Sequence, residues 1–156
     1  MKKLVAVPCF NEEDNIDSCI ESLLSLKNEK IDEFDILVVN DGSKDETSKK
    51  LNQFSNLITV ISSKQNFGLS EVFNSILYFS KEENYDQLII FDSDNQYPFE
   101  DIPKLFKKIS TEELDIVIGS TKLICTGGIP PPNKFPDSCC VCACIVVVVI
   151  VGIGIA

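Results

Sequence analysis

Short apolar runs and amphipathic stretches alternate along the first 119 residues of the chain. The apolar runs are mostly rich in valine and isoleucine, as is typical of strands buried on both faces, and they cover residues 4–7, 36–39, 57–61, 88–91 and 116–118. Between these runs, apolar residues recur at helical spacing over residues 16–24, 69–77 and 102–109. The alternation predicts βαβ units, and so an α/β fold with a mostly parallel sheet and helices on both faces.

The character of the sequence changes after residue 120. Residues 121–138 are rich in glycine and proline, which predicts a linker, and residues 139–156 carry no charge. As a helix the apolar tail would span ~27 Å, just enough for a bilayer core. We therefore divide the chain into a domain over residues 1–120, the linker, and a tail that is interpreted either as a membrane anchor or as an artefact of truncation or reading frame. The four cysteines of the tail are too tightly spaced for a zinc ribbon.

Polar side chains follow the predicted strands at their carboxyl ends, where ligands bind to parallel α/β sheets. Asn11 and Glu12 follow the first strand, Asp41 the second, Asn66 and Gly68 the third, and Asp92, Asp94 and Gln96 the fourth. Taken singly, each cluster also fits an ordinary loop: Asn11 as a helix cap, Ser43 and Glu46 as a capping box, Gly68 as a residue with positive φ. Clusters at successive strand ends instead favour one shared ligand site.

Charge and composition narrow the chemistry. The net charge of −10 argues against a nucleic-acid partner, and the absence of histidine excludes histidine-based catalysis and metal ligation. No glycine-rich dinucleotide or P-loop motif is present. Asp92 and Asp94 are separated by one serine and repel each other, so they suit a hard divalent cation that bridges to a diphosphate. The apolar run at the N-terminus is too short for a signal peptide, which predicts a cytoplasmic protein.

The series VAVPCFNEEDNI, ILVVNDGSKDET, NFGLSEVFNSIL, IIFDSDNQYPFEDIPKL and DIVIGS resembles glycosyltransferase family 2, which has the GT-A fold, over residues 3–120. DSDNQYPFEDI is most similar to the dolichyl- and undecaprenyl-phosphate sugar transferases. The resemblance implies that Pro8, Asn11 and Glu12 lie against the nucleoside and that Asp41 hydrogen-bonds the base. Asn66 and Gly68 would belong to the same donor site. Asp92 and Asp94 would hold Mg²⁺ or Mn²⁺ with the diphosphate, and Gln96 would complete the metal site.

The resemblance implies transfer of a sugar, with inversion, from a UDP- or GDP-sugar to a polyprenyl phosphate at the cytoplasmic face of a membrane. Thr121 and Lys122 stand where the family often has an arginine, and the family's acceptor half has no match here, so no catalytic residue is assigned. One alternative is a donor-binding fragment without catalysis, and another is a transferase to a sugar hydroxyl of a surface polysaccharide. A nucleotidyltransferase is disfavoured because PCFNEEDN replaces the basic, glycine-rich loop of such enzymes.

Overall fold

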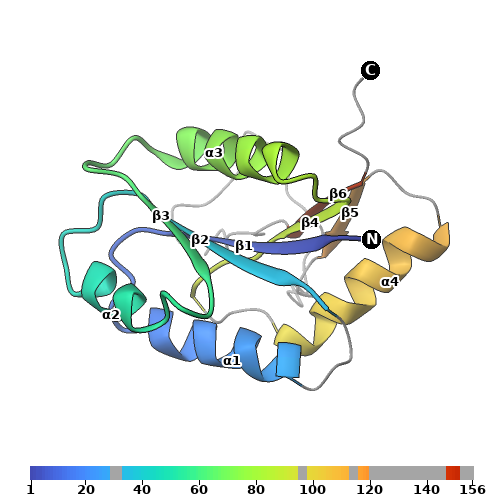
Figure 1. The fold of residues 1–156 in the computed structure, drawn as a ribbon, viewed down its shortest axis with the longest axis horizontal. Coiled ribbons are helices and arrows are strands. Elements are labelled where there is room, and N and C mark those ends of the chain that lie inside the picture. Colours follow the sequence, from blue (N-terminus) through green and yellow to red (C-terminus); the bar gives the residue numbers. More distant parts are fainter. Residues whose placement is uncertain (29–32, 95–97, 113–115, 120–146, 152–156) are drawn as a thin grey trace, which may run out of the picture.

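One six-stranded sheet organises the chain (Figure 1). The computed structural model describes residues 1–28, 33–94, 98–112, 116–119 and 147–151. The strands are β1 (Lys3–Cys9), β2 (Asp35–Asn40), β3 (Thr59–Ser62), β4 (Gln87–Ile90), β5 (Ile116–Gly119) and β6 (Val147–Val151). The helices are α1 (Ile16–Asn28), α2 (Thr47–Gln53), α3 (Leu69–Glu82) and α4 (Ile102–Glu112), with a 3₁₀ turn, η1 (Phe99–Asp101), before α4. The strand order is β3-β2-β1-β4-β6-β5.

The first four strands are parallel, and β1 lies at their centre. Ala6 of β1 is in register with Leu37 of β2 on one side and with Ile90 of β4 on the other. The chain therefore builds outward from β1 through β2 to β3, and then returns to the opposite side of β1 with β4. Such a reversal of strand order leaves a crevice outside the carboxyl ends of the two strands between which it occurs. The fold thus predicts a ligand site beyond the ends of β1 and β4.

Helices cover both faces of the sheet, as the sequence predicts (Figure 1). Successive strand residues point to opposite faces, so Val5 and Val7 pack with α1, α2 and α4, whereas Leu4 and Ala6 pack against α3. Both cores are dry and closely filled, because these strand side chains are at most 1% exposed. The α3 face is the one on which the crevice opens.

The predicted elements differ from the structure between β2 and β3. The third apolar run was predicted over residues 57–61, but β3 begins at Thr59 and leaves Leu57 exposed. Helix α2 has only seven residues, too few to produce a helical period that could be recognised in the sequence. The capping box of Ser43 and Glu46 is wrong, because Glu46 itself occupies the N-cap position and makes no side-chain cap.

The apolar tail contributes a strand to the sheet. Residues 147–151 form β6, which lies antiparallel between β4 and β5, whereas the sequence predicted a tail separate from the domain of residues 1–120. All five residues of β6 are β-branched, which favours a strand over a helix in water. Within the described residues, none of the helices has the length and apolar character needed to span a bilayer. The linker, the cysteine cluster and the rest of the tail lie outside the described residues.

Candidate functional site

A cavity of about 470 Å³ opens at the carboxyl ends of β1, β2 and β4, on the side of the sheet that α3 covers. Six residues that the sequence singled out line it together: Pro8, Glu12, Asp41, Asn66, Gly68 and Asp92. Sequence reasoning missed the apolar part of the lining, which includes Phe10 after β1 and Leu69, Val72 and Phe73 on α3. The helical spacing of the three α3 residues was recognised, but it was interpreted only as a core face. The cavity therefore combines a carboxylate-rich floor with an apolar wall.

Asp41 joins three segments at the floor of the cavity. Its carboxylate is almost buried, at 4% exposure, and accepts the backbone N–H of Phe67 at 2.9 Å and that of Gly68 at 2.8 Å, one on each oxygen. Its own N–H donates to the carbonyl of Cys9 at the end of β1. Each carboxylate oxygen retains a second lone pair, so Asp41 can still accept a hydrogen bond from a ligand. The same side chain thus shapes the β3–α3 loop and faces the cavity.

Two glycines determine how the β3–α3 loop approaches β2. Gly42 has φ +70°, and a Cβ placed on it would lie 2.4 Å from the backbone carbonyl carbon of Gln65. The loop therefore packs directly on the backbone after β2, where no side chain fits. Gly68 has φ +90°, which confirms the interpretation of this residue as a loop glycine, although a Cβ there would meet no atom within 4 Å. Gly68 also lines the cavity, so its structural role and its predicted ligand role coincide.

The carboxylates after β4 sit where negative charge is unfavourable. Burial raises the pKa of Asp92, the neighbouring carboxylates of Asp94 and Glu12 raise it further, and only the 2.9 Å hydrogen bond from the Ser93 N–H lowers it. None of the described residues that line the cavity is basic. Carboxylate oxygens such as those of Asp92 are hard ligands of the kind that Mg²⁺ and Mn²⁺ prefer.

The protein supplies only part of a metal coordination shell at this place. Among the described residues, no three cysteine, aspartate or glutamate side chains are arranged to hold a metal ion by themselves. Gln96, the third predicted metal ligand, lies outside the described residues.

Two buried cysteines lie close to the site, and Cys9 is part of the cavity lining. Cys9 and Cys19 are buried and form no disulfide. Burial, together with nearby carboxylates (Glu12 for Cys9 and Asp92 for Cys19), raises the pKa of each thiol to about 12. Both thiols are therefore protonated at neutral pH, and they act as small apolar side chains instead of nucleophiles or metal ligands.

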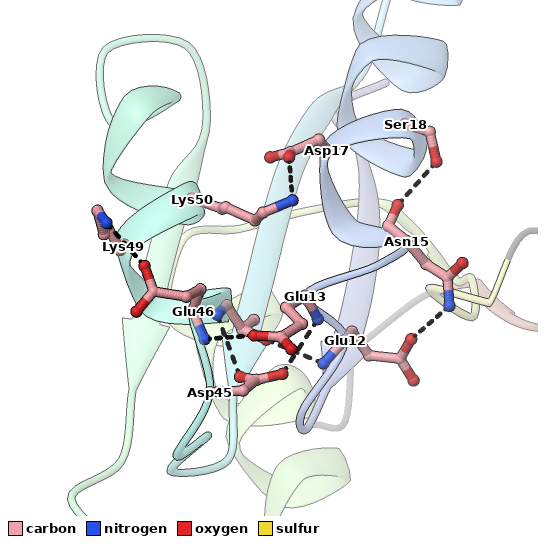
Figure 2. A network of polar contacts seen from close by, with 10 residues as sticks. Glu12, Glu13, Asn15, Asp17, Ser18, Asp45, Glu46, Lys49 and Lys50 are labelled. Carbon is pink, nitrogen blue, oxygen red and sulfur yellow. Dashed lines mark hydrogen bonds and ion pairs between the residues drawn. The ribbon is translucent and has the colours of Figure 1, made fainter.

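Asn11 lies at the edge of the site, where it connects two loops. Its φ is +56°, its N–H donates to the Ser43 hydroxyl at 2.9 Å, and its side-chain oxygen accepts the N–H of Lys44 at 2.9 Å. Asn11 is therefore not a helix cap: its side chain is exposed and is used by the loop after β2. The next residue, Glu12, borders the cavity, and its carboxylate accepts the side-chain N–H of Asn15 at 3.0 Å (Figure 2).

The sequence matches a family model and several characterised proteins. The model described as glycosyl transferase family 2 matches residues 4–132. Dolichol-phosphate mannosyltransferase of Pyrococcus furiosus is 34% identical over 125 residues, which are 77% of this chain and 33% of that protein. Undecaprenyl-phosphate 4-deoxy-4-formamido-L-arabinose transferase of Photorhabdus laumondii is 31% identical over 110 residues, which are 68% of this chain and 33% of that protein. The chain thus spans about a third of the length of these two relatives.

Solved structures of glycosyltransferases share the GT-A fold of this chain. Residues 1–349 of TarS from S. aureus, in complex with UDP-GlcNAc, superpose with a TM-score of 0.62 at 25% identity, covering 84% of this chain and 37% of TarS. Glucosyl-3-phosphoglycerate synthase of Mycobacterium tuberculosis, in complex with Mn²⁺, UDP and glucosyl-3-phosphoglycerate, superposes with a TM-score of 0.58 at 25% identity, covering 74% of this chain and 42% of that enzyme.

Proposed function

The chain belongs to glycosyl transferase family 2, and from this premise we propose that its cavity binds a nucleoside-diphosphate sugar and that the sugar is transferred to a polyprenyl phosphate. One observation carries the proposal. Six polar and loop residues, drawn from four strand ends and identified before the fold was known, line a single cavity. Its volume of about 470 Å³ lies within the range of small-molecule sites in proteins.

The cavity lining suggests a role for each part of the donor. Asp41 would accept a hydrogen bond from the base, and Pro8 and Glu12 would lie against the nucleoside, with Phe10 offering an apolar ring beside them. Asn66 and Gly68 would border the same ligand. Asn11 would contribute by fixing the loop that carries Glu12, since its side chain is engaged by Lys44. These assignments are supported by shared position around one cavity.

Asp92 and Asp94 would hold Mg²⁺ or Mn²⁺, and Gln96 follows them in the sequence as a further ligand. When bound, the cation would neutralise charge that develops on the diphosphate as the sugar–phosphate bond breaks. The carboxylates of this chain contribute the anionic end of the site, where burial first, and then the neighbouring carboxylates of Asp94 and Glu12, raise the pKa of Asp92. The structural neighbour glucosyl-3-phosphoglycerate synthase, solved with Mn²⁺ and UDP, supports the same choice of cofactor.

Calorimetric titration of the chain with UDP- and GDP-sugars, each with and without Mn²⁺, tests donor binding. We expect one nucleotide to bind, and to bind more tightly with Mn²⁺. Asp94→Asn should weaken the Mn²⁺-dependent binding by about tenfold or more, equivalent to about 1.4 kcal/mol. Asp101→Asn is the matched control, because Asp101 pairs with Lys104 at 2.6 Å and does not line the cavity. Equal Mn²⁺-dependent binding by wild type and Asp94→Asn would refute the metal assignment.

A polyprenyl phosphate is the proposed acceptor because two relatives carry dolichol-phosphate and undecaprenyl-phosphate in their names. A phosphate acceptor is already ionised, so it needs little help from a general base. A sugar hydroxyl would need a carboxylate close to the attacking oxygen, and it is the weaker candidate.

Transfer needs an acceptor held in line with the anomeric carbon, in a site that excludes water. Every residue assigned above belongs to the donor side, and about two thirds of each of the two relatives has no counterpart in this chain. We therefore expect these 156 residues to bind donor but to transfer sugar feebly or not at all. Radiolabelled UDP- and GDP-sugars with a polyprenyl phosphate in detergent test this expectation, and sustained metal-dependent transfer would contradict it.

A further inference from the structure

We propose that Thr47, on the first turn of α2 and outside the cavity lining, is a positioning residue that holds Glu12 at the cavity edge. The inference rests on the proposed function, because it assigns Thr47 to the organisation of the donor site. Thr47 is fully buried, and its hydroxyl accepts the backbone N–H of Glu12 at 2.9 Å. The two residues are 35 positions apart in the sequence.

Three consecutive backbone N–H groups after β1 are taken up by side chains of the β2–α2 loop. The N–H of Asn11 donates to the Ser43 hydroxyl at 2.9 Å, and that of Glu13 donates to the Asp45 carboxylate at 3.1 Å. The N–H of Glu12 lies between them and donates to Thr47. Because each bond engages the backbone, together they determine where the main chain of the loop runs and which way its side chains leave it.

Return bonds run from the β2–α2 loop to the same segment. The N–H of Lys44 donates to the side chain of Asn11, and the N–H of Glu46 donates to the carboxylate of Glu13 at 2.9 Å. Figure 2 shows Glu13 and Asp45 facing each other between the two loops, with the ion pair of Lys50 and Asp17 joining α2 to α1 above them. The two loops therefore behave as one unit.

Thr47 joins the two loops because it bonds in two directions. Its hydroxyl accepts the N–H of Glu12, and its own backbone N–H donates to the Asp45 carboxylate at 3.1 Å. The Asp45 carboxylate also accepts the N–H of Glu13. A valine at position 47 would keep the shape of the side chain but would remove the acceptor of the Glu12 N–H.

Glu12 needs such support because neighbouring carboxylates repel its own carboxylate. Its carboxylate and that of Asp92 line the same cavity and act on each other as like charges, and Asp94 adds a third negative charge to Asp92. Glu12 is also partly exposed, so its side chain could turn toward solvent if the backbone were free to move. The bonds from the Glu12 N–H to Thr47 and from the Glu13 N–H to Asp45 hold the backbone from which the Glu12 side chain leaves.

Titration of the full chain with UDP and GDP in the presence of Mn²⁺ tests the inference. Losing one hydrogen bond that orients Glu12 should weaken nucleotide binding by about three- to tenfold in Thr47→Val. Thr47→Ser retains a hydroxyl and should bind within about twofold of wild type. Ser48→Ala is the matched control: Ser48 lies on the same turn of α2 as Thr47 and accepts a 2.8 Å hydrogen bond from the Asn40 side chain, whereas the N–H groups of residues 11–13 bond to Ser43, Thr47 and Asp45.

A double-mutant cycle separates positioning from general loosening. If Thr47 acts through Glu12, Thr47→Val should change nucleotide affinity by less than about twofold in a Glu12→Gln background. If Thr47→Val does not fold, Asp45→Asn replaces it, with the exposed Asp14→Asn as its control. Asp45→Asn removes the charged acceptor of the Glu13 N–H and should also weaken binding.

The outcomes distinguish this inference from the proposed function. Two results would overturn the positioning role alone, provided that the wild type binds nucleotide. The first is equal nucleotide affinity of Thr47→Val and the wild type, and the second is an equal loss of affinity in Ser48→Ala and Thr47→Val. Additive effects of Thr47→Val and Glu12→Gln would overturn it as well. Failure of the wild type to bind either UDP or GDP would overturn the proposed function, and this inference with it.

Discussion

Asp41→Asn should destabilise the fold as well as the site. The amide has one acceptor oxygen, whereas the carboxylate of Asp41 uses both oxygens to accept the N–H groups of Phe67 and Gly68. One of these N–H groups would face an amide NH₂ in a nearly closed environment, since Asp41 is only 4% exposed. A hydrogen bond to a charged group contributes about 1.5–3 kcal/mol, and leaving a buried donor unsatisfied costs about 1–3 kcal/mol. We therefore expect a loss of about 2–4 kcal/mol in the free energy of unfolding.

Urea denaturation followed by circular dichroism measures that loss, and amide hydrogen exchange locates it. The N–H groups of Phe67 and Gly68 should exchange faster in Asp41→Asn, while amides in the centre of β1 change only by the global loss of stability. Asp101→Asn serves as the control and should stay within about 0.5 kcal/mol of wild type, as is usual for exposed substitutions. An unfolding free energy of Asp41→Asn equal to that of the control would refute the reasoning that Asp41 holds the β3–α3 loop.

Three further predictions follow from the same geometry. Asp41→Ala should weaken nucleotide binding even in EDTA, whereas Asp92→Ala should weaken it only when metal is present. Calorimetry under both conditions measures the two affinities, and equal behaviour of the two variants would contradict separate roles. The folded-state pKa of Asp92 is raised above its ordinary 3.8, so its stabilising contribution is present at low pH and is lost as the pH rises through the folded pKa. The melting temperature of Asp92→Asn should therefore exceed that of the wild type at pH 7, and the difference should vanish below about pH 3.8. Gly42→Ala should lower stability by more than the roughly 1 kcal/mol of strain expected for Gly68→Ala, because only Gly42 abuts the backbone of Gln65, and equal melting temperatures would contradict this.

Much of the fold could be predicted because its determinants are local. Buried strands and amphipathic helices leave periodic patterns, and the rule that ligands bind at the carboxyl ends of parallel strands gathered Glu12, Asp41 and Asp92 before any coordinates were known. The same reasoning could not place β6, because pairing of residues 147–151 with β4 depends on a contact across about sixty residues that leaves no periodic trace. An isolated run of valine and isoleucine indicates burial without indicating a partner.

The parts of the site that sequence reasoning missed are those in which one polar group serves another. Sequence reasoning gave Asn11 only a role beside the nucleoside, which stays a prediction, and it missed the hydrogen bonds that connect Asn11 to the loop after β2. Thr47 was not considered, because a buried threonine at the start of a short helix resembles any other. Such roles are decided by which donor lies opposite which acceptor. That information appears only when two loops far apart in sequence are brought together.

The arrangement of charge implies that metal and nucleotide bind cooperatively. Glu12, Asp92 and Asp94 concentrate negative charge around a cavity whose described lining contains no basic residue, so a diphosphate alone would be repelled. We expect a cation alone to bind weakly, because no three carboxylates or cysteines of the described residues are arranged to hold one. Each partner therefore supplies what the other lacks. By linkage, the factor by which Mn²⁺ tightens UDP or GDP must equal the factor by which that nucleotide tightens Mn²⁺. The two factors are measured by titrating nucleotide with and without Mn²⁺, and Mn²⁺ with and without nucleotide. Equal nucleotide affinity with and without Mn²⁺ would show that the excess negative charge is neutralised by another group.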